Sequence, residues 1–341
     1  MGRFEISYEE ALRNRKQNKY SHWGYYKKTD FEDTSGLYAG QRLRANKLFE
    51  PKLFDAVKLP RDGNFFAMGS CFAREVEYAL IQKGVEFLSV PTVFRNEDPN
   101  PLSGSSSPAN TFVTKYNVFS VLNAFRWAFE DPSPYPQNAL IKTSEGTYVD
   151  LHSHTTLSDL PLNSAIERRC KVDAYVRRAM EADVVILTFG FCELWWDREI
   201  EAYLNIPPNG RIAKTYPGRF TFRLPEFEEL VSALDELHGL FAEHGKPGVQ
   251  IVCTVSPVSL SNTFRKEDVV IANCFSKSLN RVGVEYWKNK YDNVHYFPSY
   301  EIVTCSEVAT AWKDDRRHPS DEVIASVVKS FEANYFDKVT T

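Results

Sequence analysis

The sequence predicts an α/β fold in which a mostly parallel sheet lies between two layers of helices. Two observations support this prediction. Short, continuously apolar segments recur along the chain, as in "NFFAMGS" at 64–70 and "DVVILTFG" at 183–190, and such segments are typical of strands buried on both faces. Most of them are followed by a segment in which apolar residues have helical spacing. Alternating strands and helices predict a three-layer sandwich decorated by loop insertions.

The N-terminal part of the chain differs from the rest. Residues 1–60 are polar and irregular, and we expect an N-terminal arm or cap packed on the core, with a short helix near 7–16. Residues 61–341 then form one domain with insertions near 91–160 and 196–224. The first insertion opens with a segment rich in Pro, Ser and Asn, which predicts a long loop that borders the site.

Within the domain, each element follows from a local pattern. After the first strand, Phe72, Val76 and Leu80 recur at helical spacing, and Gly84 is a typical helix stop. Further strands are expected where short apolar segments recur, at 85–91, 183–190, 249–258 and from 293 onwards. Further helices are expected at 118–131, 163–181, 225–244, 267–283 and 319–332. The segment 147–154 predicts a strand followed by a turn.

Composition narrows the class of protein. The chain has 341 residues, of which 43% are apolar and 25% are charged, as in a globular protein. The formal net charge of −4 argues against a nucleic-acid partner, because nucleic-acid binders usually carry a basic surplus. No apolar segment approaches the roughly 20 residues needed to span a bilayer, and the N-terminus lacks an apolar signal core. We therefore expect a cytoplasmic protein, of an oligomeric state that the sequence does not indicate.

Metal and cofactor sites are not expected. None of the six cysteines forms a C-x-x-C pair, and neither common glycine-rich phosphate loop is present. His152 and His154 would share one face of a strand, which is a spacing found in metal sites, but a structural role or a ligand contact is the alternative. Aromatic residues make up 14% of the chain, which fits either a glycan-binding surface or a large core.

Polar residues follow several of the predicted strands. In open parallel sheets, ligands bind beyond the carboxyl ends of the strands. Ser70 ends the first strand, Gly190 to Glu193 follow the strand at 183–190, and Ser256 follows the next. The turn "DRRHPS" is expected directly after the last strand. We therefore expect these segments to meet at one edge of the sheet.

Ser70 and Cys71 stand at the junction of the first strand and helix. The Ser70 hydroxyl is either a helix N-cap or a nucleophile, whose developing oxyanion the helix N-terminus would stabilise. A thiol at this position can be a thiolate nucleophile because its pKa falls near a helix N-terminus. Adjacent side chains on a turn point in different directions, so a nucleophilic Ser70 would leave Cys71 to packing.

His318 is the candidate base for Ser70. Asp315 lies three residues before it, and a carboxylate there can bind Nδ1, fix the tautomer of the ring and stabilise the imidazolium. The alternative is a surface histidine in a charged loop.

These segments together resemble a known family. "GSCFA" at 69–73 is similar to the pentapeptide that names the GSCFA family. The resemblance continues, in the order of that family, with "DVVILTFGFCELWWD" at 183–197, "TVSPV" at 254–258, "SKSL" at 276–279, "FPSYEIV" at 297–303 and "DRRHPS" at 315–320. It implies an SGNH/GDSL hydrolase-like, flavodoxin-like sandwich over roughly residues 60–330.

The resemblance also implies roles for individual residues. Ser70 matches the nucleophile, His318 the base and Asp315 the acid that orients it. Residues 190–193 fall where SGNH enzymes carry Gly-x-Asn-Asp, so Gly190, Cys192 and Glu193 are the expected oxyanion or substrate-binding residues, with Cys71 beside them. Cys192 replaces the asparagine donor, and a thiol is a poor donor. Asn110, from the long loop, is expected to supply an amide instead.

Three functions fit these residues. The first is a serine esterase that cleaves an acyl ester on a carbohydrate or glycan through an acyl-enzyme and needs no cofactor. The second is an acyltransferase at the same site, in which a polysaccharide hydroxyl replaces water and acyl-CoA is the donor. The third is a non-catalytic glycan-binding protein, which the substitution of Cys192 and the many aromatic residues would explain.

Overall fold

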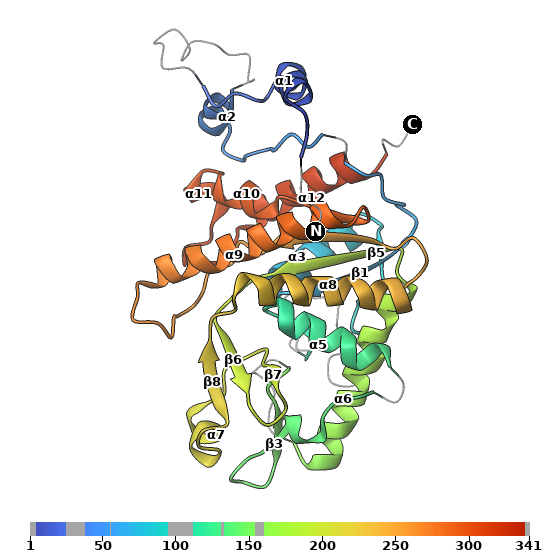
Figure 1. The fold of residues 1–341 in the computed structure, drawn as a ribbon, viewed down its shortest axis with the longest axis vertical. Coiled ribbons are helices and arrows are strands. Elements are labelled where there is room, and N and C mark those ends of the chain that lie inside the picture. The colour runs from blue at the N-terminus through green and yellow to red at the C-terminus, as the bar shows by residue number, and fades with distance from the viewer. Residues whose placement is uncertain are drawn as a thin grey trace.

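A five-stranded, all-parallel sheet forms the centre of the protein (Figure 1). The computed structural model describes residues 5–24, 38–54, 56–94, 112–130, 133–153 and 160–337. The strand order is β10-β9-β5-β1-β2. The bounds of these strands are β1 Asn64–Gly69, β2 Glu86–Phe87, β5 Val184–Phe189, β9 Gln250–Val255 and β10 Val294–Tyr296. The three central strands are thus the apolar segments that the sequence marks as strands buried on both faces.

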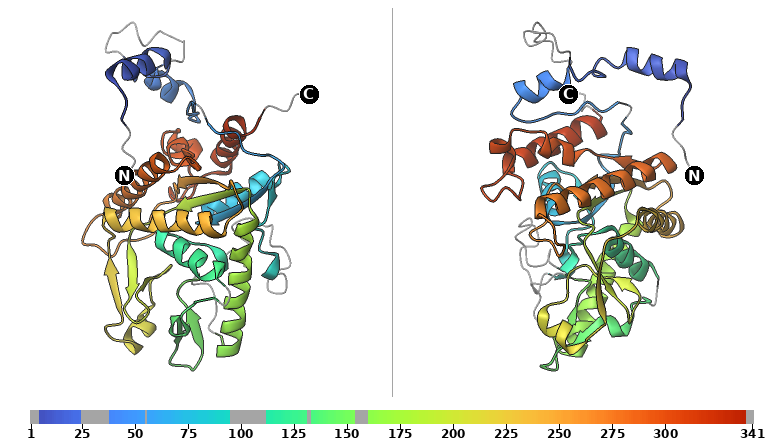
Figure 2. Two further views of the ribbon diagram at one scale, coloured as in Figure 1. Left: turned by 45° about the vertical axis from the view of Figure 1, so that its right-hand side comes forward. Right: turned by 60° about the vertical axis from the view of Figure 1, so that its left-hand side comes forward.

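Helices cover both faces of this sheet (Figure 2). One face carries α5 (Val118–Phe129), α6 (Leu162–Arg177), α8 (Phe227–His244) and α9 (Val269–Lys290). The other carries α3 (Cys71–Ile81), α10 (Ser299–Thr304) and α12 (Asp321–Tyr335). Alternate residues of β1 divide between the two cores, with Phe66 and Met68 in the first and Phe65 and Ala67 in the second. The predicted three-layer α/β sandwich is therefore confirmed.

Two small antiparallel sheets extend the sandwich at one end (Figure 1). β3 (Leu140–Lys142) pairs with β4 (Tyr148–Asp150), and β6 (Leu194–Asp197) pairs with β7 (Ala202–Tyr203) and β8 (Phe220–Arg223). The shorter helices are η2 Thr92–Phe94, η4 Gln137–Ala139, η5 Arg178–Glu181, α7 Gly210–Thr215 and α11 Val308–Ala311. No helix in the described parts of the chain combines the length and the apolar character that a membrane span requires.

The N-terminal segment lies on the side of α10 and α12 (Figure 2). α1 (Tyr8–Gln17) and α2 (Ala39–Ala45) bury none of their residues. The segment that follows them contacts the core through its backbone: the Phe49 N–H donates to Ser306 Oγ and the Leu59 N–H donates to the Tyr335 carbonyl, at 2.8 Å each. The division of the chain at residue 60 stays a prediction.

Two expected strands are shorter than the sequence suggests. The strand expected at 85–91 contains only β2, because the Ser89 hydroxyl accepts the Ala67 N–H (2.8 Å) in place of a backbone carbonyl. The segment that starts at 293 leaves the sheet after Tyr296, and Pro298 then precedes α10. α10 and α11 therefore stand between β10 and the turn "DRRHPS", which does not follow the last strand directly.

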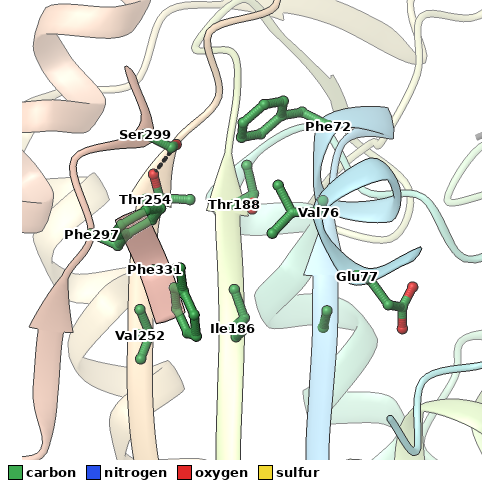
Figure 3. Close-up of a pocket in the computed structure, with 12 residues that line it drawn as sticks. Phe72, Val76, Glu77, Ile186, Thr188, Val252, Thr254, Phe297, Ser299 and Phe331 are labelled. Carbon is green, nitrogen blue, oxygen red and sulfur yellow. Dashed lines mark hydrogen bonds between the residues drawn. The ribbon is translucent and has the colours of Figure 1, made fainter. Parts of the chain in front are cut away.

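A small enclosed cavity remains between the sheet and α3 (Figure 3). Its volume is about 10 Å³, and apolar side chains such as Val76, Ile186 and Phe331 form most of its wall. At one end the Thr254 and Ser299 hydroxyls are hydrogen-bonded to each other. A space of this size holds about one water molecule, so it is too small for a substrate.

Gly69 generates the first prediction, because it ends β1 with a positive φ of 154° and lies against β5. A Cβ there would lie 2.5 Å from the Thr188 carbonyl oxygen and 2.7 Å from the Thr188 Cβ. We expect Gly69→Ala to lower the free energy of unfolding by about 2 kcal/mol or more, measured by urea denaturation, because backbone has to move.

The control is Gly239→Ala in α8, where a Cβ meets nothing within 4 Å. This change should raise the free energy of unfolding by about 0.5–1 kcal/mol, because alanine favours a helix. Equal effects of the two substitutions would contradict the close packing of β1 on β5.

Candidate active site

An open cavity of about 480 Å³ lies where β1, β5 and β9 end. This volume is in the usual range for small-molecule sites. The residues that line it include Ser70 after β1, Phe191 and Glu193 after β5, and His318 from the turn before α12. The structure therefore brings Ser70 and His318 to one cavity, although 248 positions separate them in the chain.

Ser70 occupies the N-cap position of α3, but its side chain does not cap the helix. The hydroxyl instead donates a hydrogen bond of 3.0 Å to Ser256 Oγ. Both serines are buried. The helix-cap interpretation of Ser70 is therefore wrong, and its hydroxyl lies in the wall of the cavity.

Asp315 fixes the ring of His318. Asp315 Oδ1 accepts the backbone N–H groups of Arg317 (2.9 Å) and His318 (3.0 Å), and Oδ2 lies 2.6 Å from His318 Nδ1. The backbone N–H of His318 and then its ring hold the pKa of Asp315 well below its usual range. A carboxylate that stays ionised makes Nδ1 the protonated nitrogen of a neutral ring, so Nε2 carries the lone pair that a base needs.

Ser70 Oγ and His318 Nε2 each contact another partner in this structure. Ser70 is bonded to Ser256, and Arg317 Nη1 lies 3.4 Å from His318 Nε2. Catalytic hydrogen bonds are often long or unformed in the absence of substrate. Ser70 and His318 therefore share a cavity but are not hydrogen-bonded to each other in this structure.

Cys71 also lines the cavity and packs in part against the core beneath α3. The expectation that it would face only the core is thus too narrow. Burial raises the pKa of the Cys71 thiol above its usual value, although the Arg317 guanidinium partly offsets this. The thiol therefore stays protonated at neutral pH, which removes the argument for a preformed thiolate.

The turn after β5 uses its N–H groups within the protein. The N–H groups of Gly190 and Phe191 donate to the Tyr116 carbonyl at 3.2 and 2.9 Å, and the N–H of Cys192 donates to Ser276 Oγ at 3.2 Å. Neither Gly190 nor Cys192 is among the described residues that line the cavity. Burial raises the pKa of Cys192 to about 12. The expected oxyanion donors of this turn are therefore engaged elsewhere.

Glu193 and Asn110 are the two remaining residues that were expected to bind substrate. Glu193 lines the cavity, but its carboxylate accepts from Thr263 Oγ1 at 2.6 Å and from the Phe264 N–H at 3.0 Å. It therefore holds the loop after β9 in place. Asn110 lies outside the described residues.

Lys277 is a site residue that the sequence argument did not single out. It is buried, and its Nζ donates to the carbonyls of Gly190 (3.0 Å) and Val258 (2.7 Å) and lies 4.7 Å from the centre of the Phe191 ring. One ammonium thus joins the turns that follow β5 and β9. Its position in "SKSL", inside one of the segments that resemble the family, was the available signal.

Asn205 is a second residue of this kind. Its Oδ1 accepts the Tyr116 N–H, and its Nδ2 donates to the Thr114 carbonyl, both at 2.9 Å. Asn205 thereby holds the segment before α5 against the strand ends. No local pattern marks it, because its partners lie about 90 positions away in the chain.

His152 is buried in the protein core. It lies in a turn after β4, not on the strand, and is buried 4.7 Å from the Trp127 ring, centre to centre. Burial lowers the pKa of His152 to about 3, so the ring is neutral. His154 lies outside the described residues, and within those residues no three His, Cys, Asp or Glu side chains gather in a way that could hold a metal.

Lys277 generates a prediction about stability and pH. Burial lowers its pKa from 10.5 to about 7 in the folded protein. Between these values the unfolded chain binds more protons at this lysine than the folded chain. The free energy of unfolding therefore rises with pH, by at most about 1.4 kcal/mol per pH unit from this group. Lys277→Met should flatten the rise between pH 7 and 10 in urea unfolding.

Lys329→Met is the matched control, because the Lys329 side chain is 79% exposed and its removal should leave the slope as in the wild type. If Lys277→Met also has the wild-type slope, the buried ammonium does not titrate as the structure indicates.

The chain was compared with protein families, curated sequences and solved structures. A carbohydrate esterase of family 3 from Clostridium thermocellum aligns over 80% of this chain and 94% of its own, with a TM-score of 0.32 and 11% identity. That similarity is too low to support an argument about function. No curated protein sequence matches the chain. The model of the GSCFA family, however, matches residues 64–331, from the start of β1 into α12. The protein is therefore a member of the GSCFA family.

Proposed function

We propose that the protein is a serine esterase that hydrolyses an acyl ester on a carbohydrate, with Ser70, His318 and Asp315 as its catalytic residues. The observation that carries the proposal is the placement of Ser70. Its hydroxyl has no capping role, and it lines the same cavity as a histidine whose Nδ1 is held by a carboxylate.

The reaction follows from these groups. Ser70 Oγ turns from Ser256 to His318 Nε2, transfers its proton there and attacks the ester carbonyl. The imidazolium, stabilised by Asp315, then protonates the departing sugar oxygen and leaves an acyl group on Ser70. A water molecule, activated by the same histidine, cleaves the acyl-enzyme and restores the serine.

The start of α3 supports the oxyanion in this proposal. The first N–H groups of a helix have no acceptor within the helix, and they carry the positive end of its dipole. The backbone N–H of Cys71 is the first of these groups in α3. This donor replaces the contribution that was expected from Gly190 and Cys192.

The carbohydrate part of the proposal rests on the walls of the cavity. Phe191 and Phe264 contribute aromatic side chains to this wall, and Asn262 and Ser261 contribute polar ones. Mixed aromatic and polar walls suit a sugar ring. No particular contact favours transfer of an acyl group from acyl-CoA, or glycan binding without catalysis, so both remain outcomes of the test.

We expect turnover of acetylated sugars or short 4-nitrophenyl esters, which Ser70→Ala should lower by about a thousand-fold or more. Cys71→Ala should keep turnover within about ten-fold of the wild type, because a protonated thiol performs no step. It should lower the free energy of unfolding by about 1–2 kcal/mol. Initial rates and urea unfolding of both variants are the measurements.

Two results would contradict the assignment. A Ser70→Ala enzyme that keeps its activity, while a thiol-alkylating reagent abolishes it and substrate protects, would make Cys71 the nucleophile. Calorimetric binding of an acetylated oligosaccharide without turnover in any assay would favour a glycan-binding protein instead.

A further inference from the structure

The guanidinium of Arg317 lies in the wall of the cavity and forms no ion pair with any residue that the structure describes. Its Nε donates to the Ser259 carbonyl at 2.9 Å, and its Nη1 lies 3.4 Å from His318 Nε2. Among the described residues no carboxylate lies within ion-pair distance of this guanidinium, and Nη2 contacts no acceptor. An arginine in a polar wall normally pairs with a carboxylate, because its planar fork fits two oxygens at once. Within the described residues the fork therefore has free N–H groups that suit a carboxylate of a bound ligand.

The other charged groups of the cavity leave this role to Arg317. It is the only Arg or Lys among the described residues that line the cavity. Glu193 also lines the cavity, but it forms no ion pair with Arg317, and its two oxygens accept from Thr263 Oγ1 and the Phe264 N–H. The guanidinium also partly offsets the effect of burial on the pKa of Cys71 and of Tyr116, so its charge acts on the centre of the cavity. One cation matches one negative charge, which favours a carboxylate over a dianionic phosphate.

We infer that Arg317 binds a carboxylate carried by the ester substrate, and that the protein prefers acidic esters to neutral ones. This inference rests on the proposed esterase function. The carboxylate lies either on the acyl group, as in the half-ester of a dicarboxylic acid, or on the sugar, as in a uronic acid. Both sources offer the same two oxygens to the guanidinium.

The contact between Arg317 and His318 gives the carboxylate a second effect. In the structure without substrate, Nη1 faces the lone pair that must accept the proton of Ser70. A carboxylate that binds the guanidinium competes for this N–H group and frees Nε2. A neutral ester offers no group that competes for the contact between Arg317 and His318. An acidic substrate should therefore bind more tightly and also leave His318 Nε2 free to accept the proton.

Two matched pairs of esters test the preference and identify its source. The first is 4-nitrophenyl hemisuccinate against 4-nitrophenyl butyrate, where a carboxylate replaces a methyl group on the acyl chain. The second is an O-acetylated methyl glucuronoside against the O-acetylated methyl glucoside, where the carboxylate lies on the sugar. The wild type should favour the acidic member of one pair by about ten-fold or more in kcat/KM.

Substitutions then assign the preference to Arg317. Arg317→Gln should abolish it and raise kcat/KM for the neutral ester by up to about ten-fold, because Nε2 is released. Arg317→Lys should keep part of the preference, since it retains the charge but not the fork. Arg316→Gln is the control, because Arg316 is exposed, is not among the residues that line the cavity, and should leave the ratio unchanged.

Binding gives a readout that needs no turnover. Calorimetry with succinate and with glucuronate should detect binding of one of them to the wild type and to Arg316→Gln, but not to Arg317→Gln. The inference is wrong if neither binds, or if Arg317→Gln binds as the wild type does. Hydrolysis of neutral and acidic esters at equal rates would leave the esterase proposal intact and overturn this one. If binding of a carboxylate depends on Arg317 but no Ser70-dependent turnover is found, the carboxylate site stands and the esterase proposal fails.

Discussion

The close approach of β1 and β5 at their carboxyl ends is the constraint on which the site depends. Gly69 lies opposite Thr188 in the sheet, with no room for a side chain between them. Gly190, just beyond β5, also lies close to its neighbour, since a Cβ there would be 2.9 Å from the Tyr116 carbonyl oxygen. Because neither glycine has a side chain, the backbone segments can approach this closely, and Ser70 Oγ lies 3.0 Å from Ser256 Oγ.

Buried donors hold the turns around this edge. A backbone carbonyl that leaves a sheet loses its partner, and an unpaired buried carbonyl is costly. Lys277 satisfies two such carbonyls, of Gly190 and Val258, and Asn205 satisfies a third, of Thr114. Burial of the ammonium itself has a cost, seen in the lowered pKa of Lys277. Burial of the ammonium therefore lowers the free energy of unfolding, while its hydrogen bonds hold the turns beside the cavity in a fixed position.

Burial and hydrogen bonds set the protonation states of Cys71 and Asp315. Burial keeps the Cys71 thiol protonated, while three hydrogen bonds keep Asp315 ionised beside His318. The same short turn carries Arg317, whose Nη1 lies 3.4 Å from His318 Nε2 and whose guanidinium has no carboxylate partner among the described residues. Residues 315–318 thus bring a carboxylate, two guanidinium groups and an imidazole together in one turn. In the proposed reaction a single segment both activates the serine and selects the substrate.

The sequence by itself determined the α/β class, the three central strands and the residues at their ends. Apolar segments buried on both faces, and helical spacing after them, are local patterns. They predict the elements correctly because burial of these apolar side chains stabilises the fold. It did not determine the length of β2, the position of the last turn, or the partner of Ser70. A helix cap and a nucleophile have the same local sequence, and only the strand order β9-β5-β1 places the Ser70 hydroxyl beside Ser256. The tertiary structure also decided that Cys192 is turned away and that Lys277, Asn205 and Arg317 belong to the site. Their partners lie in other segments of the chain, and such contacts depend on how strands are ordered in the sheet rather than on any local spacing.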